Sequence, residues 1–144
     1  MNCLNSRMAK LRTSSLKIGR VVNQILSNIL PTYPIIAEKG TQYPFAVYRR
    51  TGLQTANTKD IYNTVEYATV EIIVAATTYN ESLKYAQDVK VHLENQRGFS
   101  ESAKEEDIKI TDVFLTGASE DFVNDAYIQY MTFVIHIEGE HGYR

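Results

Sequence analysis

The sequence predicts an α+β domain: a mostly antiparallel β-sheet with two helices packed on one face, in the order α-β-β-β-α-β-β. Apolar residues recur at helical spacing in two segments, 14–30 and 80–98. Apolar and polar residues alternate in the segments between and after them, most clearly over 65–77 and 126–138. At 144 residues the chain has the usual length of one domain.

The N-terminal part divides into an arm and a helix. Residues 1–13 show no sustained periodicity, so we expect a flexible basic arm before a single domain over 14–144. Ser14 or Ser15 offers the N-cap of the first helix. Pro31 ends this helix because proline lacks an amide hydrogen and restricts the residue before it. The apolar face of the helix comprises Ile18, Val22, Ile25 and Ile29.

The next segments are predicted to be strands. A short extended piece over Ile35–Glu38 precedes a strand over Tyr43–Gly52, which is entered at Pro44. Residues 53–64 are polar and predict a long connection or a flared hairpin tip. The strongest strand signal is Val65–Thr77, whose apolar face comprises Ala68, Val70, Ile72, Val74 and Ala76.

The second half repeats the pattern of helix and strands. Asn80 is the expected N-cap of the second helix, whose apolar face comprises Leu83, Ala86, Val89 and Leu93. An acidic loop over 99–107 leads to a strand over Ile108–Thr116, and Gly117–Asp125 is expected to be an acidic turn region. The closing strand, Ala126–Glu138, has an inward face of Met131, Phe133, Ile135 and Ile137.

The residue types needed for catalysis do not gather in the sequence. Cys3 lies in the arm without a nearby histidine, and the three histidines, His92, His136 and His141, are expected to be exposed or at a sheet edge. A catalytic triad assembled in space stays open at this point. The acidic clusters lack the glycine-hinged ligand spacing of a calcium loop, and no glycine cluster precedes a helix. We therefore expect no catalytic residues, no metal ligands and no cofactor.

Charge and aromatic composition point to protein contacts. The net charge is −2, but residues 1–20 hold five basic residues and no acid, whereas residues 100–125 hold eight acids and two lysines. The chain has ten tyrosines and no tryptophan, and amphipathic tyrosine rings suit interfaces. The residues expected at an interface are Tyr48, Arg50, Lys59, Asp60, Tyr62, Glu105, Glu106, Glu120 and Asp121.

Two other classes of partner are not expected. Arg49 and Arg50 are adjacent on a strand and point to opposite faces, so they cannot form one nucleic-acid-binding patch. No apolar stretch approaches the roughly 18 residues that a membrane helix needs, so no membrane contact is expected. The single cysteine excludes an internal disulfide, which favours a reducing compartment.

Several segments together resemble one family. They are YPFAVYRRTG over 43–52, YATVEIIVAATTYNES over 67–82, YAQDVKVHLE over 85–94, ITDVFLTGASEDF over 110–122 and DAYIQYMTFVIHI over 125–137. In order and type they resemble the small tail-completion, or tail-terminator, proteins of long-tailed phages and prophages, over roughly residues 16–138. These are packing motifs, and the order of the elements gives them their weight.

The resemblance implies a structural protein of the virion. Such subunits close into a ring, usually a hexamer, on the head-proximal end of the tail tube, where the ring ends tube polymerisation and presents a surface for the head connector. It implies a place in the tail or neck of the virion, after assembly in the bacterial host cytoplasm. The family has no catalytic residues to transfer. Its strand signature matches Tyr43, Pro44, Phe45, Val47 and Tyr48, with an architectural role.

Three other functions stay open at this point. A head–tail connector or stopper component shares the size and the sheet-rich form. A small ligand-binding domain or a nucleic-acid-binding domain would belong to a different class. For the virion hypothesis, we expect the acidic segments 101–107 and 119–125 to steer the chain towards a basic partner surface.

Overall fold

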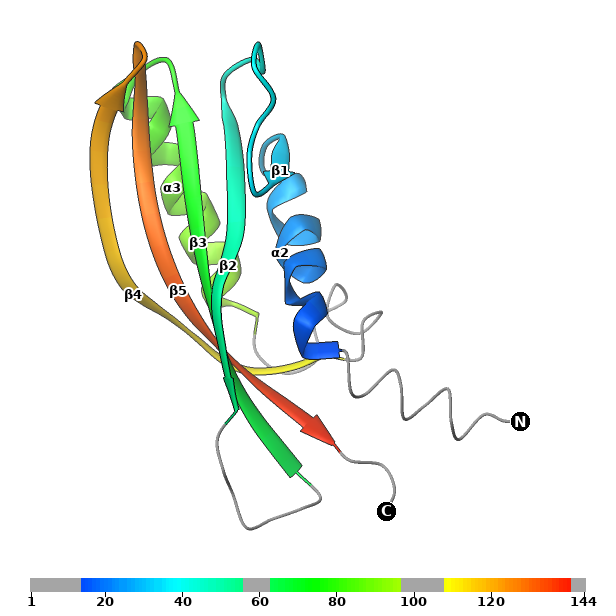
Figure 1. The fold of residues 1–144 in the computed structure, drawn as a ribbon. Helices are drawn as coiled ribbons and strands as arrows, with labels where there is room; N and C mark the ends of the chain where they lie inside the picture. The colour runs from blue at the N-terminus through cyan, green and yellow to red at the C-terminus, as the bar shows by residue number, and fades with distance from the viewer. Residues whose placement is uncertain (1–13, 56–62, 97–107, 141–144) are drawn as a thin grey trace.

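A computed structural model of the chain describes residues 14–55, 63–96 and 108–140. Within these residues a five-stranded sheet has the strand order β1-β2-β3-β5-β4, and the helices pack against one of its faces (Figure 1). Four of the strands pair antiparallel, and only the short β1 pairs parallel to its neighbour. The predicted α+β class and the mostly antiparallel sheet are confirmed.

The first helix is shorter than predicted. A 3-10 turn, η1 (Ser14–Lys17), precedes the α-helix α2 (Ile18–Ser27). The predicted serine cap is wrong, because Lys17 holds the N-cap position and makes no side-chain capping bond. The helix stops before Leu30, whose amide still donates to the Leu26 carbonyl at 3.0 Å. Its buried residues are Ile18, Val21, Val22, Ile25 and Leu26, and Ile29 is only partly buried.

The first strand lies three residues earlier than predicted. β1 (Thr32–Pro34) pairs with β2 (Phe45–Thr55), and the expected extended piece over Ile35–Glu38 is not a strand. Ile35 has a φ of 69°, in the left-handed region that is an outlier for a β-branched residue. The chain therefore leaves the extended conformation directly after Pro34.

The central hairpin is longer than predicted. β2 pairs antiparallel with β3 (Asn63–Ala76), and β2 continues past Gly52 to Thr55, so the predicted connection 53–64 is partly strand. The remainder of that connection, 56–62, lies outside the described residues. The predicted inward face of β3 is confirmed, since Ala68, Val70, Ile72, Val74 and Ala76 are all buried.

The second helix keeps its predicted position with a different cap and one different core residue. α3 (Tyr79–Glu94) is capped by Thr78, whose hydroxyl accepts from the Glu81 amide at 3.2 Å, so the prediction of Asn80 is wrong. Leu83 is 39% exposed, because one helical step rotates a side chain by about 100° away from the buried row. The buried row comprises Ser82, Ala86, Val89 and Leu93.

The last two strands form a second long hairpin. β4 (Lys109–Val123) and β5 (Ala126–Glu140) pair antiparallel, so the predicted turn region Gly117–Asp125 is mostly strand. The turn is confined to Asn124 and Asp125, with φ of 51° and 61°, as a tight hairpin turn requires. The acidic residues fit this strand because its end is exposed.

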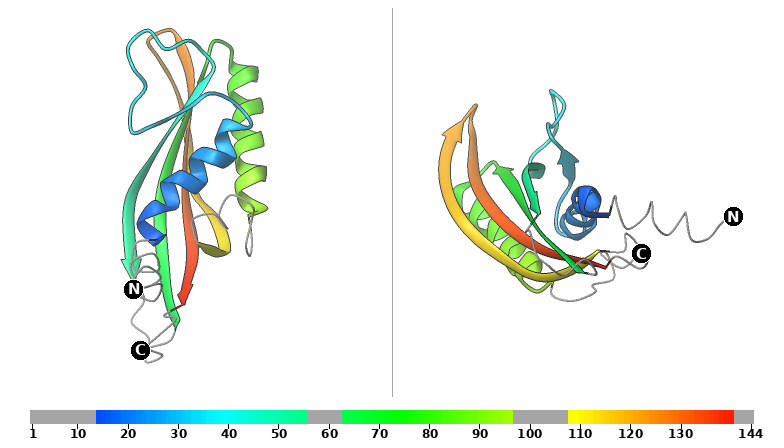
Figure 2. Two further views of the ribbon diagram at one scale, coloured as in Figure 1. Left: turned by 90° about the vertical axis from the view of Figure 1, so that its right-hand side faces the viewer. Right: turned by 60° about the horizontal axis from the view of Figure 1, so that its bottom comes forward.

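One hydrophobic core joins both helices to the sheet. Phe133, Ile72 and Ile18 are each fully buried, and they come from β5, β3 and α2. The predicted inward face of β5 is confirmed, with Met131, Phe133, Ile135 and Ile137 all buried. The opposite face carries no helix among the described residues, and the sheet is strongly twisted (Figure 2). No described helix is long and apolar enough to cross a membrane.

Candidate interaction surface

The histidines in the described ranges have packing or backbone contacts. The His136 ring lies edge-on to Tyr67 and to Phe114, with ring centroids 4.5 and 5.0 Å apart. The His92 Nδ1 atom lies 2.7 Å from the Asp88 carbonyl oxygen one turn earlier in α3. No group of three or more histidine, cysteine, aspartate or glutamate side chains that could hold a metal occurs in the described parts of the chain. Cys3 and His141 lie outside these parts.

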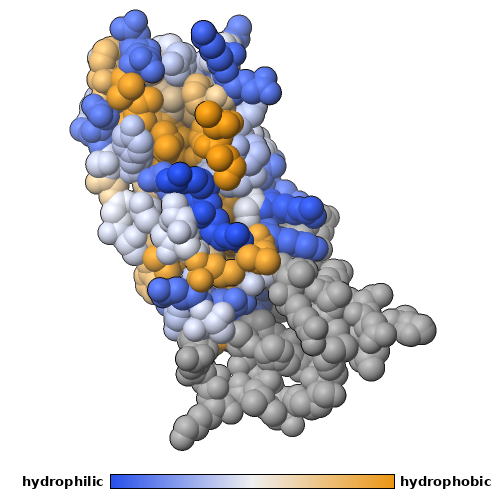
Figure 3. Space-filling view, in the orientation of Figure 1, coloured by the Kyte–Doolittle hydropathy of each residue, from blue (hydrophilic) through white to orange (hydrophobic). Residues whose placement is uncertain are grey.

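The sheet face away from the helices, here called the uncovered face, has an apolar part near the β4–β5 turn. Figure 3 shows apolar side chains gathered on this part of the molecule. The Phe45 ring contacts Tyr43 and Tyr33, with centroids 5.3 and 6.3 Å apart. Beside it in the sheet, Val47 and Ala75 are 8% and 2% exposed, although no described helix covers them. Aromatic rings thus shield part of the uncovered face.

A charged pair separates this apolar part from the aromatic cluster around His136. Arg49 of β2 and Glu71 of β3 lie opposite each other and form an ion pair of 3.4 Å. A shallow hollow of about 420 Å³ adjoins Glu71 and is lined by polar and small residues: Gly117, Ala118, Ser119, Tyr130 and Thr132. The uncovered face therefore alternates apolar and polar zones.

The β4–β5 turn carries a second group of exposed rings. Phe122 is 53% exposed and contacts Tyr127 at 4.8 Å between centroids. The Tyr79 hydroxyl donates to the Glu120 carboxylate at 3.0 Å. This hydrogen bond, with smaller contributions from desolvation and from the Glu120 charge, raises the pKa of Tyr79. Gln129 also donates to Glu120 at 3.0 Å, so the start of α3 is tied to the hairpin.

Two predicted interface residues lie on the helix side of β2. The ring of Tyr48 packs beside α2, since a Cβ added at Gly19 would lie 3.3 Å from it. Burial raises the pKa of Tyr48. The Arg50 guanidinium is exposed and donates to the Leu16 carbonyl at 3.0 Å. Tyr48 thus contributes mainly to packing, and Arg50 keeps an accessible charge at the edge of the sheet.

The other predicted interface residues divide into two groups. Glu120 and Asp121 are both exposed: the Glu120 carboxylate accepts from Tyr79 and Gln129, and Asp121 accepts from the Phe122 amide at 2.8 Å. The remaining five lie outside the described residues: Lys59, Asp60, Tyr62, Glu105 and Glu106. The described structure therefore places only four of the nine predicted interface residues, on two different parts of the molecule.

Sequence reasoning missed the edges of the sheet and the apolar residues beside them. Ile35 and Ile36, directly after β1, are 64% and 74% exposed. The Ile35 amide donates to the Tyr48 carbonyl at 2.8 Å, which places it along the outer side of β2. The available signal was the pair of isoleucines directly after Pro34. The prediction of an extended piece over 35–38 did not identify them as exposed residues at the edge of the sheet.

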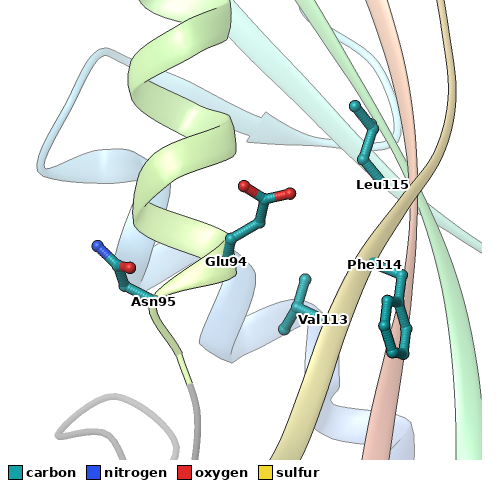
Figure 4. Close-up of a pocket in the computed structure, with 5 residues that line it drawn as sticks. All are labelled: Glu94, Asn95, Val113, Phe114 and Leu115. Atoms are coloured by element: carbon teal, nitrogen blue, oxygen red, sulfur yellow. The ribbon is translucent and has the colours of Figure 1, made fainter.

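A groove of about 620 Å³ lies between the end of α3 and β4. Val113 and Leu115 lie on the β4 side of it, and Glu94 at the end of α3 lies on the other side (Figure 4). Asn95 and Phe114 complete its described lining. The Glu94 carboxylate accepts from Lys90 at 2.9 Å and remains partly exposed. The groove is therefore apolar on one side and acidic on the other.

Comparison with known proteins gives a match in structure. The sequence matches no protein-family model and no curated protein. The fold is similar to that of a chain in the virion of a native gene transfer agent particle, with a TM-score of 0.52 and 14% sequence identity. The similarity covers 92% of this chain and 94% of that chain. At this identity it shows a shared fold over nearly the whole length of both chains.

Proposed function

We propose that this chain is a structural protein of a phage-like virion. Its subunits form a ring, in the first instance a hexamer, on the head-proximal end of a tail tube, where the ring ends polymerisation and joins the head connector. The observation that carries this proposal is the fold shared with a chain of a gene transfer agent virion over 92% of this chain. The motif order described above supports the assignment to a tail terminator.

The surface supports a role in assembly. One sheet face is uncovered, with apolar and charged zones side by side, and large apolar residues are exposed at one edge and at the β4–β5 turn. Exposed apolar patches of this kind mark contact sites. A subunit that contacts copies of itself, a tube below and a connector above needs several such surfaces. We propose that the chain works without catalysis, cofactor or metal, in the tail or neck of a virion assembled in the bacterial cytoplasm.

The test is electron microscopy of the purified chain with and without a phage tail-tube protein. We expect rings with a central opening, bound at one end of each tube, and tubes that stop growing when the chain is added. A chain that binds isolated connectors and leaves tube growth unchanged would instead be a connector or stopper component. A chain that stays monomeric and binds neither tube nor connector would contradict the virion role.

A further inference from the structure

The sheet ends in two edges that no described strand covers. On one side, β1 pairs only with Ala46–Tyr48, so the rest of β2 has no strand beyond it among the described residues; we call Arg49–Thr55 the β2 edge. On the other side, β4 pairs with β5 and has no described strand on its outer side. Unpaired edges of this length are templates for pairing with another chain, and proteins rarely leave them open without a reason.

The two edges lie at the same level of the sheet. The pairing partners can be followed from β2 through β3 and β5 to β4. One row runs through Arg50, Val70, Phe133 and Leu115. The next runs through Gly52, Thr69, Val134 and Phe114, and a third through Leu53, Ala68, Ile135 and Val113. The β2 edge therefore stands in the same rows as the part of β4 that lines the groove.

The strand directions also match. β2 and β3, β3 and β5, and β5 and β4 are each antiparallel, so β4 runs opposite to β2. A neighbouring copy rotated about an axis along the strands keeps its strand directions. Its β2 would therefore lie antiparallel to β4 of the first copy, which is the more stable form of pairing. Repeating this contact is a head-to-tail arrangement, which closes into a ring when the rotation between neighbouring copies divides a full turn.

The chemistry of the two edges is complementary. The groove beside β4 has Val113 and Leu115 on one side and Glu94 on the other. The β2 edge offers Arg50, which is exposed, whereas Leu53 packs against the core of its own copy. Along the same edge of the molecule lie Ile35 and Ile36, the two most exposed large apolar residues that the structure describes.

We propose that the β2 edge of one copy pairs with β4 of the next, and that its exposed Arg50 lies against Glu94 at the rim of the groove beside β4. This inference rests on the proposed ring and names the surfaces that build it. The sheet then continues from subunit to subunit, with Arg50 beside Leu115 and Gly52 beside Phe114. Arg50 meets Glu94 across the contact.

Cysteine cross-linking tests the pairing. In a Cys3→Ser background, Gly52→Cys and Phe114→Cys place two thiols in one row on opposite edges of each copy. A Cβ at Gly52 lies 3.8 Å from Thr69, an ordinary contact, so the variant fits the fold. The matched control pairs Gly52→Cys with Ser119→Cys, which lies roughly 15 Å further along β4, beyond the reach of a disulfide. Each single variant serves as a second control.

The expected result is a ladder of covalent dimers, trimers and larger species for the matched pair under mild oxidation, and no ladder for the shifted pair or the single variants. An oligomer of ring mass that gives no ladder, or gives the same ladder with the shifted pair, overturns the edge pairing and leaves the ring itself in place. A chain that is monomeric alone and also fails to bind tail tubes removes the proposed function as well. Solution mass and tube binding are measured on the same samples.

A charge exchange tests the contact between Arg50 and Glu94. Arg50→Glu and Glu94→Arg should each weaken ring assembly about tenfold or more, because like charges then meet at the contact. The double variant should recover most of the affinity. Thermal unfolding of each variant distinguishes a folding defect from a loss of assembly. This control is needed because Arg50 also donates to the Leu16 carbonyl. A double variant as weak as the single ones would exclude this contact.

Discussion

Isoleucines in this chain occupy two opposite environments. Ile72 is fully buried between the sheet and the helices, whereas Ile36 is 74% exposed. Replacing Ile72 with alanine should lower the free energy of unfolding by about 2–5 kcal/mol, because methyl groups leave the core and a cavity remains. Ile36→Ala is the matched control and should change the stability of the monomer by less than about 0.5 kcal/mol. Urea denaturation of both variants measures this; equal losses would place the core elsewhere.

Tyr48 predicts a specific response to alkaline pH. Burial raises the pKa of Tyr48 above its ordinary value of about 10. The unfolded chain therefore loses this proton first as the pH rises. The contribution of Tyr48 to stability is complete below about pH 10 and is lost as the pH passes through the raised pKa. Unfolding free energies measured along this range should fall more steeply for the wild-type chain than for Tyr48→Phe, and identical slopes would contradict the prediction.

At the scale of elements, α3 depends on a single capping residue. The Thr78 hydroxyl satisfies the Glu81 amide, which has no partner within the helix. Thr78→Ala should destabilise the fold by about 0.5–2 kcal/mol. Thr77→Ala, one residue earlier and exposed, provides the control, and Asn80→Ala tests the residue that the sequence favoured. Chemical denaturation should show a loss for Thr78 alone; a larger loss for Asn80 would reverse the assignment.

Elements with a buried face could be predicted from the sequence because burial imposes a period. The inward rows of β3 and β5 each place four or more apolar residues at every second position, and both are buried as expected. The end of β4 has no such row, since Gly117–Val123 is exposed, so its acidic residues resembled a turn. Pairing with β5 makes it a strand, and strand propensity is known to depend on such context.

The candidate site could be predicted only in part for a similar reason. The sequence placed Tyr48 and Arg50 on a strand, but their face depends on where the helices pack. The edges of the sheet follow from the strand order, in which β5 separates β3 from β4. No local pattern carries this information. The exposure of Ile35 depends on a left-handed backbone conformation that β-branched residues rarely adopt.

For the whole molecule, the uneven charge predicts salt-dependent association. Asp121 and Glu120 are both exposed, but Glu120 holds Tyr79 and Gln129 and should be left unchanged. Neutralising Asp121, Glu105 and Glu106 as Asn, Gln and Gln should slow association with the tail tube or connector at low ionic strength, because steering by charge raises association rates. At about 1 M salt, where screening acts within about 3 Å, the variant and the wild-type chain should associate equally fast.

The measurement is stopped-flow association at both salt concentrations. Thr132→Val, an uncharged change on a different part of the surface, is the control for general surface effects. If the acidic substitutions do not change the association rate at low ionic strength, these acids do not steer association. They would then serve only to keep their segments solvated.

The irregularities in the two outer strands bear on how the chain avoids fibres. β4 shifts register between Ile110 and Asp112 and again between Leu115 and Gly117, and β2 does so between Arg50 and Gly52. Such bulges bend an edge and interrupt its row of hydrogen-bonding groups. A stray flat strand could pair with β4 over only a few residues before losing register. Only an edge strand with matching bulges could pair with β4 over a longer stretch. The bulges that discourage amyloid-like stacking would therefore also select the correct neighbour.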